Sequence, residues 1–457
     1  MNPTIPPSKE DSVTRRSFLR KTGTAMAGGA LLSQLPIERF ALGASATDTV
    51  KVALVGCGGR GSGAADQALK TEGSVKLVAM ADAFKDRLDG SLRGLREQHQ
   101  DRPERIEVTD DHKFVGFDGY KAAIELADVV ILATPPGFRP IHFEEAIRQG
   151  KHVFMEKPVA VDAPGVRRVL AAAEEAKRKN LKVGVGLQRH HQQPYLETVQ
   201  RLHDGAIGDI VSMRCYWNGS GVWVRPRRQG QTEMEYQMRN WYYFNWLCGD
   251  HINEQHIHNI DVINWVKNAY PIRAQGMGGR EVRKAEFLTD RKPIELNADT
   301  LDFGEIFDHH FVEFEYDDGT RMYSQCRHIP GCWSSVSEHV QGTRGSADVS
   351  GHVIRGENDW RFRGRSGNPY QVEHDDLFKA IRENLPFNEA ENGAMSTMTA
   401  ILGRMATYSG KMLNMDDALK SEENLMPANF DWDANPPVMP DANGLYRVAI
   451  PGKSEVV

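Results

Sequence analysis

Residues 50–187 alternate short, continuous apolar runs with longer stretches in which charged residues recur at helical spacing. Continuous apolar runs of strand length, rich in β-branched residues, are typical of parallel strands that are covered on both faces. Their alternation with helices predicts a doubly wound α/β domain. The predicted strands lie at residues 50–55, 75–81, 127–134, 151–155 and 182–187.

The C-terminal half has a different pattern, in which apolar and polar residues alternate, and Asp317-Asp-Gly319 predicts a hairpin turn. We therefore expect a C-terminal α+β domain with a large, mostly antiparallel open sheet. One face would pack on the first domain, and the other would pair with a second subunit, so a homodimer or homotetramer is expected. The predicted strands lie at 272–277, 308–316, 320–327, 352–354 and 360–363, and amphipathic helices at 372–384 and 394–413.

A glycine-rich turn follows the first predicted strand. Gly56-x-Gly58-x-x-Gly61 separates the strand at 50–55 from a helical stretch that begins near Ala64. In this context the first glycine allows a tight turn, the second lets a pyrophosphate approach the backbone, and the third lets helix and strand pack closely. The turn, with Gly59 and Arg60 inside it, predicts a Rossmann dinucleotide site in which the helix N-terminus faces the phosphates.

Asp82 ends the second predicted strand, 21 residues after Gly61. An acidic residue at this place accepts hydrogen bonds from the adenosine ribose hydroxyls and repels a 2′-phosphate, which favours NAD over NADP. Lys85 and Arg87 are close enough in sequence to keep NADP possible. The alternative is that Asp82 only caps the following helix.

The first 46 residues have the pattern of an export signal. Thr14-Arg15-Arg16-Ser17-Phe18-Leu19-Arg20-Lys21 precedes a short apolar stretch of small residues at 22–32, and Ala44-Ser45-Ala46 supplies a cleavage site. This is the pattern of a twin-arginine signal and predicts a periplasmic protein. The expected organisation is a signal at 1–46, a Rossmann domain at 47–187, a substrate-binding and oligomerisation domain at 188–425, and a proline-rich tail at 426–457.

Charge and cysteine content narrow the possible partners. Residues 47–457 hold 50 Lys and Arg against 59 Asp and Glu. This acidic balance, without a basic stretch beyond the signal, argues against a nucleic-acid partner. Beyond the signal no apolar run has membrane length, so no membrane anchor is expected. The five cysteines are too few and too scattered for a disulfide scaffold.

Two stretches carry candidate chemistry. Lys157 follows the strand at 151–155 within Glu156-Lys157-Pro158, where an ammonium near a cationic nicotinamide would share a proton with a substrate hydroxyl. The alternative is that Lys157 is a surface residue before a turn. Further along, Glu254, His258 and Asp261 would share one face of a helix, where a carboxylate beside an imidazole orients an acid–base histidine.

The same stretch admits two other interpretations. His251, Glu254, His256 and His258 are residue types that ligate zinc and related metals. On a helix, however, His256 points away from His258, so at most three of the four converge, and we predict no metal. Alternatively, these are polar residues in the core of a helix packed on a sheet.

Several motifs together resemble the Gfo/Idh/MocA oxidoreductases, a group that includes glucose–fructose oxidoreductase and inositol 2-dehydrogenase. Besides the glycine turn and Asp82, the resemblance covers nearly the whole mature chain. It rests on Ala133-Thr134-Pro135 with His142 beyond it, on Glu156-Lys157-Pro158, on Gly186-Leu187-Gln188-Arg189-His190, on 205–209, on 342–345 and on 406–411.

The resemblance implies roles for particular residues. It makes His258 the acid–base that takes the hydroxyl proton, and it places Glu254 where the family usually has aspartate. Thr134, Pro135, His142, Glu156 and Lys157 are expected to contact the cofactor. Expected substrate contacts are Lys157, Arg189, Trp241, Glu254 and His258. Trp217, Trp223 and neighbouring arginines are expected in a loop over the cleft.

The function implied is NAD(P)-dependent hydride transfer between a nicotinamide and a secondary hydroxyl of a sugar, a sugar derivative or a cyclitol. Because the periplasm should hold no free NAD pool, we expect the cofactor to be loaded before export and retained. The alternative is a redox-neutral glycoside hydrolase or lyase that acts through a transient keto-sugar, although its Tyr-Pro-Thr-His-Gly motif is absent from 254–261. A third possibility is a sugar-binding protein without turnover.

Overall fold

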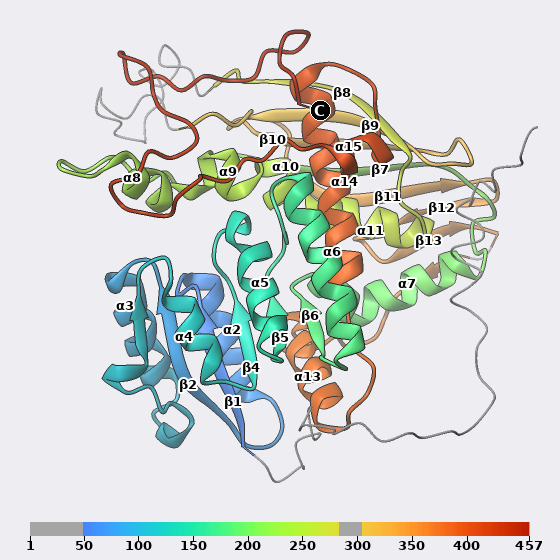
Figure 1. Ribbon diagram of the computed structural model, residues 1–457. Coiled ribbons are helices and arrows are strands. Elements are labelled where there is room, and N and C mark those ends of the chain that lie inside the picture. Colours follow the sequence, from blue (N-terminus) through green and yellow to red (C-terminus); the bar gives the residue numbers. More distant parts are fainter. Residues whose placement is uncertain (1–48, 283–303, 358, 457) are drawn as a thin grey trace, which may run out of the picture. The chain divides into compact units, whose positions relative to one another are not determined.

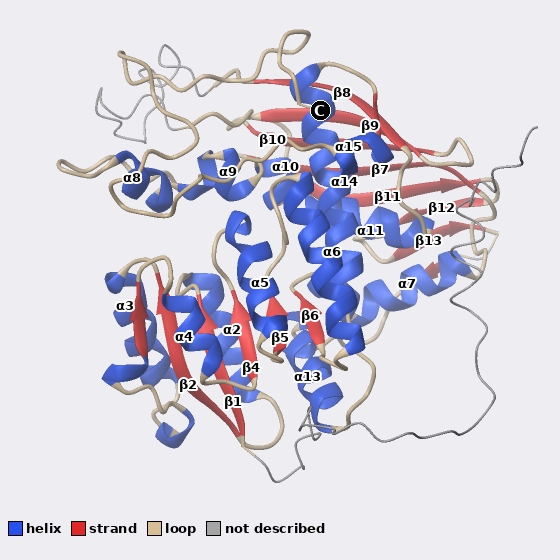
Figure 2. Cartoon of the chain, in the orientation of Figure 1, coloured by secondary structure: helices blue, strands red, loops and turns tan. Residues whose placement is uncertain are grey.

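Six parallel strands form the sheet of the N-terminal half, in the order β3-β2-β1-β4-β5-β6 (Figures 1 and 2). The computed structural model describes residues 49–282, 304–357 and 359–456, so the predicted signal at 1–46 lies outside the described residues. The chain order reverses between β1 and β4, which makes this edge the switch point where doubly wound sheets bind ligands. The strands are β1 (Val50–Val55), β2 (Val75–Asp82), β3 (Lys113–Val115), β4 (Val129–Leu132), β5 (His152–Met155) and β6 (Val183–Val185).

Helices cover both faces of this sheet, as the continuous apolar strands predict. One of them comes from far along the chain: α13 (Pro369–Arg382) packs against α2, where Leu377 and Phe378 share a core cluster with Val52 and Leu69. Ile106 makes only an isolated bridge, to Leu77 of β2. The other helices of this half are α2 (Gly59–Lys70), α3 (Lys85–Gln98), α4 (Gly119–Glu125), α5 (Arg139–Arg148) and α6 (Ala163–Arg178).

Nine strands form the second sheet, in the order β14-β13-β12-β11-β7-β10-β9-β8-β15. All neighbouring pairs are antiparallel except β7 and β10, so the predicted mostly antiparallel sheet is confirmed. Trp217, expected in a loop, lies in β7, where it pairs with Cys326 and Val336. The strands are β7 (Ile210–Gly219), β8 (Arg273–Gly279), β9 (His309–Glu315), β10 (Arg321–His328), β11 (Ser335–Gly342), β12 (Gly345–Asp348), β13 (Val353–Gly356), β14 (Trp360–Arg361) and β15 (Leu413–Asn414).

Helix α14 (Ala390–Ser409) connects the two halves, because it packs against α6 on one side and against β8 and β9 on the other. Almost every residue of this helix is buried. No helix among the described residues is both long and apolar enough to cross a bilayer. The remaining helices are α7 (Gln193–His203), α8 (Glu233–Arg239), α9 (Asn245–Cys248), α10 (His251–Glu254), α11 (Ile257–Lys267) and α15 (Met415–Lys420), with short 3-10 turns at 103–105, 110–112, 136–138, 188–191 and 241–243.

The glycine turn has the geometry that its sequence predicts. Gly56 has φ +97°, and a side chain there would meet the backbone of Ala133. A Cβ at Gly61 would clash with the carbonyl oxygen of Gly56, so the third glycine allows helix α2 to approach β1. At Gly58 and Gly59 a Cβ would meet nothing within 4 Å, which leaves open space above the turn.

We predict that Gly61→Ala destabilises the protein, whereas Gly63→Ala, in the same helix, does not. Gly63 has room for a Cβ, with only Arg60 Nη1 in contact at 3.4 Å, whereas Gly61 has none. Overpacking of this kind costs about 1–3 kcal/mol. Thermal unfolding of the purified full chain should show a lower midpoint for the first variant only, and equal midpoints would contradict the packing described here.

Candidate functional site

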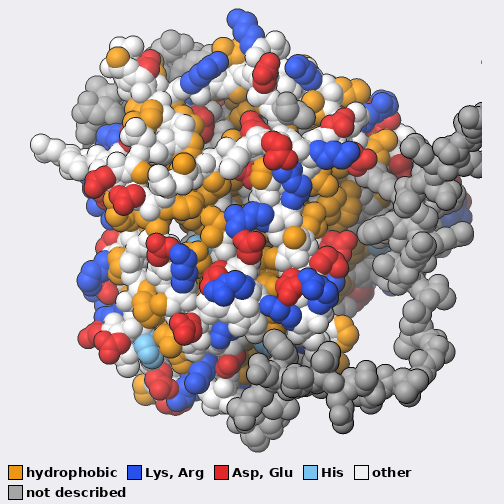
Figure 3. Space-filling view, viewed as in Figure 1, with side chains coloured by type: hydrophobic (Ala, Val, Ile, Leu, Met, Phe, Trp, Pro, Cys, Tyr) orange, Lys and Arg blue, Asp and Glu red, His pale blue; other side chains and the backbone are white. Residues whose placement is uncertain are grey.

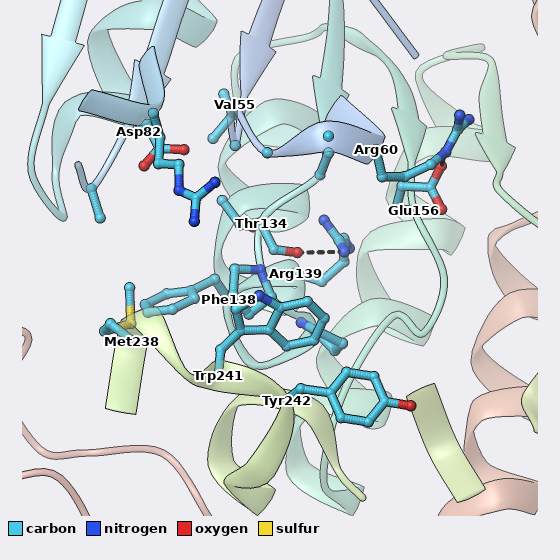
Figure 4. Close-up of a pocket in the computed structure, with 18 of the residues that line it drawn as sticks. Val55, Arg60, Asp82, Thr134, Phe138, Arg139, Glu156, Met238, Trp241 and Tyr242 are labelled. Carbon is cyan, nitrogen blue, oxygen red and sulfur yellow. Dashed lines mark hydrogen bonds and ion pairs between the residues drawn. The ribbon is translucent and has the colours of Figure 1, made fainter. Parts of the chain in front are cut away.

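A cavity of about 580 Å³ lies at the carboxyl ends of β1, β2, β4 and β5 and continues to residues of the C-terminal half. Figure 4 shows Asp82 and Val55 on one side and Phe138, Trp241 and Tyr242 on the other. On the face seen in Figure 3, acidic and basic side chains are interspersed. The expected site residues that line the cavity are Gly56, Gly58, Gly59, Arg60, Asp82, Thr134, Pro135, His142, Glu156, Lys157, Trp241, Glu254 and His258.

The end of the cavity beside the glycine turn suits an adenosine ribose. The Asp82 carboxylate accepts from the backbone N–H groups of Cys57 at 2.7 Å and Phe84 at 2.8 Å, which fixes its orientation. Burial raises the pKa of Asp82, and the two backbone hydrogen bonds oppose that rise. Arg87 and Phe117 line the cavity next to it. Asp82 therefore presents a carboxylate of fixed orientation to the cavity, the kind of acceptor that the ribose hydroxyls of NAD need.

Arg60 links the glycine turn to two buried glutamates. Its guanidinium pairs with Glu156 and, at 3.2 Å, with Glu373 of α13, and it lies 4.8 Å from the centre of the Tyr370 ring. Figure 4 shows Arg60 and Glu156 pointing toward each other. Burial, together with the charge of Glu156, raises the pKa of Glu373 well above its usual range. This bridge holds the turn, the end of β5 and α13 together at the edge of the cavity.

Lys157 meets Glu254 inside the cavity. The Lys157 ammonium donates to the backbone carbonyl of Glu254 at 2.6 Å and lies 3.2 Å from its carboxylate Oε1. Burial raises the pKa of Glu254, and the positive charge of Lys157 opposes that rise. Both side chains are only 12% exposed, so the pair is shielded from bulk water. Lys157 is therefore a largely buried residue that lines the cavity, and not a surface lysine before a turn.

His258 lies at the same end of the cavity, and no carboxylate of the described residues pairs with it. Burial, and then the charge of Lys157, hold its pKa well below the usual value, so the imidazole is neutral. Its ring stacks on Trp217 with centroids 6.0 Å apart, and its Nδ1 makes no hydrogen bond with a described residue. Asp261 instead binds His190 at 2.7 Å.

The predicted single helix through 254–261 is wrong, and so is the expectation that a carboxylate of this helix orients His258. Helix α10 ends at Glu254 and α11 begins at Ile257, with a turn between them. Because the helix breaks, Glu254 and His258 face the cavity from different helices. The four candidate metal ligands of this stretch also separate, since His256 binds Ser324 Oγ at 2.8 Å on β10.

The floor of the cavity contains a cation that sequence reasoning missed. Arg139 is almost completely buried and donates to the carbonyl oxygens of Leu132 at 2.6 Å and Thr134 at 2.7 Å. Burial lowers its pKa to about 10, and burial with the charge of Arg139 lowers that of His142 to about 3. Neutral His142 lies 3.2 Å from Thr134 Oγ1. No signal in the sequence distinguishes Arg139 from a surface arginine at the start of a helix.

Aromatic side chains form the remaining wall. Trp241 and Tyr242 precede α9, and Trp223 meets Trp241 edge-on at 5.9 Å. Arg225 stacks over the Trp223 ring at 5.1 Å. Arg189 is not among the residues that line the cavity, because its guanidinium binds the fully buried Glu338 at 2.6 Å. The wall is apolar and aromatic with a few polar groups, which suits a ring-shaped polar ligand.

Comparison with known proteins agrees with this geometry. Residues 50–186 match the model described as "Oxidoreductase family, NAD-binding Rossmann fold", GFO_IDH_MocA. Residues 50–186 are thus similar to the NAD-binding Rossmann domain of oxidoreductases. The matching model is that of the Gfo/Idh/MocA family, the family that the motifs resemble.

Relatives and solved structures are similar over part or most of the chain. An inositol 2-dehydrogenase of Ralstonia nicotianae is 28% identical over 249 residues, which are 52% of this chain and 60% of that protein. A glycosyl hydrolase family 109 protein of Shewanella pealeana is 24% identical and covers 50% of each. The chain spans about half the length of these curated relatives. A scyllo-inositol dehydrogenase of Lactobacillus casei, solved with NAD(H) and scyllo-inositol, has the same fold, with TM-score 0.57, 19% identity and coverage of 81% and 100%.

The position of Arg189 leads to a test of its role. Arg189→Ala leaves Glu338 buried without its cation, and such losses cost about 3–5 kcal/mol. We expect the free energy of unfolding to fall by that amount, whereas Arg201→Ala, which removes an exposed arginine over Trp360, should change it little. If Arg189 instead contacts substrate, denaturant unfolding stays near wild type while KM rises.

Proposed function

We propose that this protein exchanges hydride between a retained NAD and a secondary hydroxyl of a sugar, sugar derivative or cyclitol, after export by the twin-arginine pathway. The observation that carries the proposal is that Lys157, Glu254 and His258 face one end of the cavity whose other end holds Asp82 and the glycine turn. The open space above Gly58 and Gly59 and the oriented carboxylate of Asp82 fit NAD. When bound, NAD would accept the hydride from the substrate.

The protein's own residues move and hold the hydroxyl proton. Neutral His258, whose side chain lines the cavity, accepts it. Lys157, fixed by Glu254, donates a hydrogen bond to the same oxygen and stabilises the negative charge that develops there. Trp217 and Trp241 offer faces on which a sugar or cyclitol ring stacks. The inositol dehydrogenases among the relatives support this class of substrate.

Retention of the cofactor is supported by the C-terminal tail. Trp432 packs on Phe84 and Phe117, with ring centroids 5.0 and 4.5 Å apart, beside the adenosine end of the cavity. Phe430 adds contacts to Phe117 and Phe138. The tail also runs beside α8, where Gln237 donates to the Val438 carbonyl at 2.6 Å (Figure 1). An aromatic cover of this kind slows the exit of a dinucleotide.

Helix α8 covers the adenosine end of the cavity from the other side. Arg239 lies over the Phe84 ring at 3.9 Å and pairs with Asp86 of α3 at 3.0 Å. Together with the tail, this contact ties the C-terminal half to the residues that follow Asp82. The arrangement suits an enzyme that keeps its cofactor in a compartment without a free supply.

The function is tested by the 340 nm absorbance of the purified protein when sugars, cyclitols and aryl glycosides are added without external NAD. We expect a rise that stops at one equivalent per site. Lys157→Met should slow it by about 10²–10⁴-fold while bound NAD, measured after denaturation, is unchanged. Lys151→Met, at the opposite end of β5, is the matched control. Protein purified without any nicotinamide, and unresponsive to added NAD, would rule the proposal out.

The cover over the adenosine end predicts the rate of cofactor loss. Trp432→Ala removes two aromatic contacts worth about 0.5–1.5 kcal/mol each. The dissociation rate of NAD should therefore rise by about tenfold, with turnover at saturating NAD unchanged. Leu445→Ala, a substitution at a 43% exposed side chain of the same tail, should leave the rate as it is. Equal rates for both variants would show that the tail does not retain the cofactor.

A second candidate function is a redox-neutral cleavage of a glycoside through a transient keto-sugar. The similarity to the glycosyl hydrolase family 109 protein favours it, and the same cavity residues would serve. In the absorbance experiment it gives cleaved aryl glycoside without a net rise at 340 nm. That outcome would replace the dehydrogenase proposal and keep the roles of Lys157 and His258.

A further inference from the structure

Three side chains with the chemistry of metal ligands converge in the core, outside the set that lines the cavity. Asp250 and His251 lie at the start of α10, His310 lies in β9, and all three are buried. Their ligating atoms all lie within 4.8 Å of one another. In the described ranges 49–282, 304–357 and 359–456, this is the one group of three or more His, Cys, Asp or Glu placed in that way.

The two oxygens of the Asp250 carboxylate have different surroundings. Oδ2 accepts from the Tyr408 hydroxyl at 2.5 Å and from the Phe307 backbone N–H at 3.0 Å. Oδ1 accepts from the backbone N–H of His251 and lies 2.7 Å from His251 Nδ1 and 3.2 Å from His310 Nε2. Oδ2 is thus held by two hydrogen bonds from the protein, whereas Oδ1 lies beside two imidazoles.

The two imidazole nitrogens are close to Oδ1 without pointing at it. Neither His251 Nδ1 nor His310 Nε2 has the in-plane alignment needed for a hydrogen bond to a described residue. Donor atoms that bind one ion at about 2.0–2.2 Å lie roughly 3 Å apart and point at the ion, not at each other. The observed separations are compatible with neighbouring ligands of one ion.

The hydrogen bonds behind His310 favour the same arrangement. His310 Nδ1 lies 2.9 Å from the Thr407 hydroxyl, which also lies 2.9 Å from the Arg404 carbonyl oxygen. The hydroxyl has a single proton and donates it to that carbonyl, so it accepts a hydrogen bond from Nδ1. In the neutral ring Nε2 then carries a lone pair and lies 3.2 Å from Asp250 Oδ1. Two lone pairs this close together in a dry core need a positive charge near both, which a proton or a metal ion can supply.

We propose that Asp250 Oδ1, His251 Nδ1 and His310 Nε2 bind one divalent cation of the zinc class, at a site separate from the NAD cavity. Two imidazoles and one carboxylate suit Zn²⁺, Fe²⁺ or Co²⁺ better than Mg²⁺ or Ca²⁺, which take oxygen ligands. Tyr408 and Thr407 hold the ligands in place from behind, as outer partners do at metal sites.

The cation has a positioning role for the reaction. It ties β9 to the start of α10, and Glu254, which binds Lys157 through both its carbonyl and its carboxylate, ends that four-residue helix. His251 also stacks on His328 at 4.2 Å, and His328 binds Gln255, which lines the cavity. Loss of the ion therefore loosens the helix that carries Glu254 without removing a group that touches substrate.

The test is the metal content of the purified full chain, measured by inductively coupled plasma mass spectrometry after expression with added Zn²⁺. We expect about one equivalent of Zn²⁺ per chain in the wild type and less than a tenth of that in His310→Ala. His374→Ala is the matched control, because His374 is a fully buried histidine whose ring nitrogens also lack described partners. It should keep the metal.

Measurements on the wild-type protein alone also test the proposed metal site, whether or not the variants fold. After treatment with a chelator, added Zn²⁺ should raise the unfolding temperature, and added Co²⁺ should give the visible absorption of a low-symmetry site. A wild type with no stoichiometric metal and no response to either ion overturns the proposal and leaves His310 as a protonated partner of Asp250. Metal content does not depend on turnover, so this result is independent of the proposed function.

Discussion

The contact between Lys157 and Glu254 is the interaction on which the site depends. Lys157 follows β5 of the parallel sheet, and Glu254 ends a short helix of the C-terminal half, so one buried pair joins the cofactor side to the substrate side. A buried lysine without this partner would be costly. This pair places an ammonium and a carboxylate in the same cavity as the neutral imidazole of His258.

Local patterns were enough to predict the parallel sheet, the glycine turn and Asp82, because each depends on residues close in sequence. Continuous apolar runs identify strands buried on both faces. Gly56 and Gly61 are needed because a Cβ at either position would clash with nearby backbone atoms. Lys157 and His258 were also predicted, from the resemblance to a family, and both line the cavity. Their roles in catalysis remain predictions.

What could not be predicted depends on contacts between distant segments. Periodicity suggested one helix through Glu254 and His258, but it does not reveal the break at Gln255, which tertiary packing imposes. Arg189 was expected at the substrate because its motif matches the family, whereas its partner Glu338 lies 149 positions away on β11. His310 likewise meets Asp250 only in the folded core. Pairs of this kind have no local signal.

The aromatic cover over the adenosine end has a consequence for the order of events during synthesis. Phe430 and Trp432 leave the ribosome after both sheets and every helix of the described chain. Because domains fold as they emerge, the Rossmann sheet can form while this cover is still missing. Under the proposed retention, NAD enters most easily in the interval between the folding of the sheet and the docking of the tail.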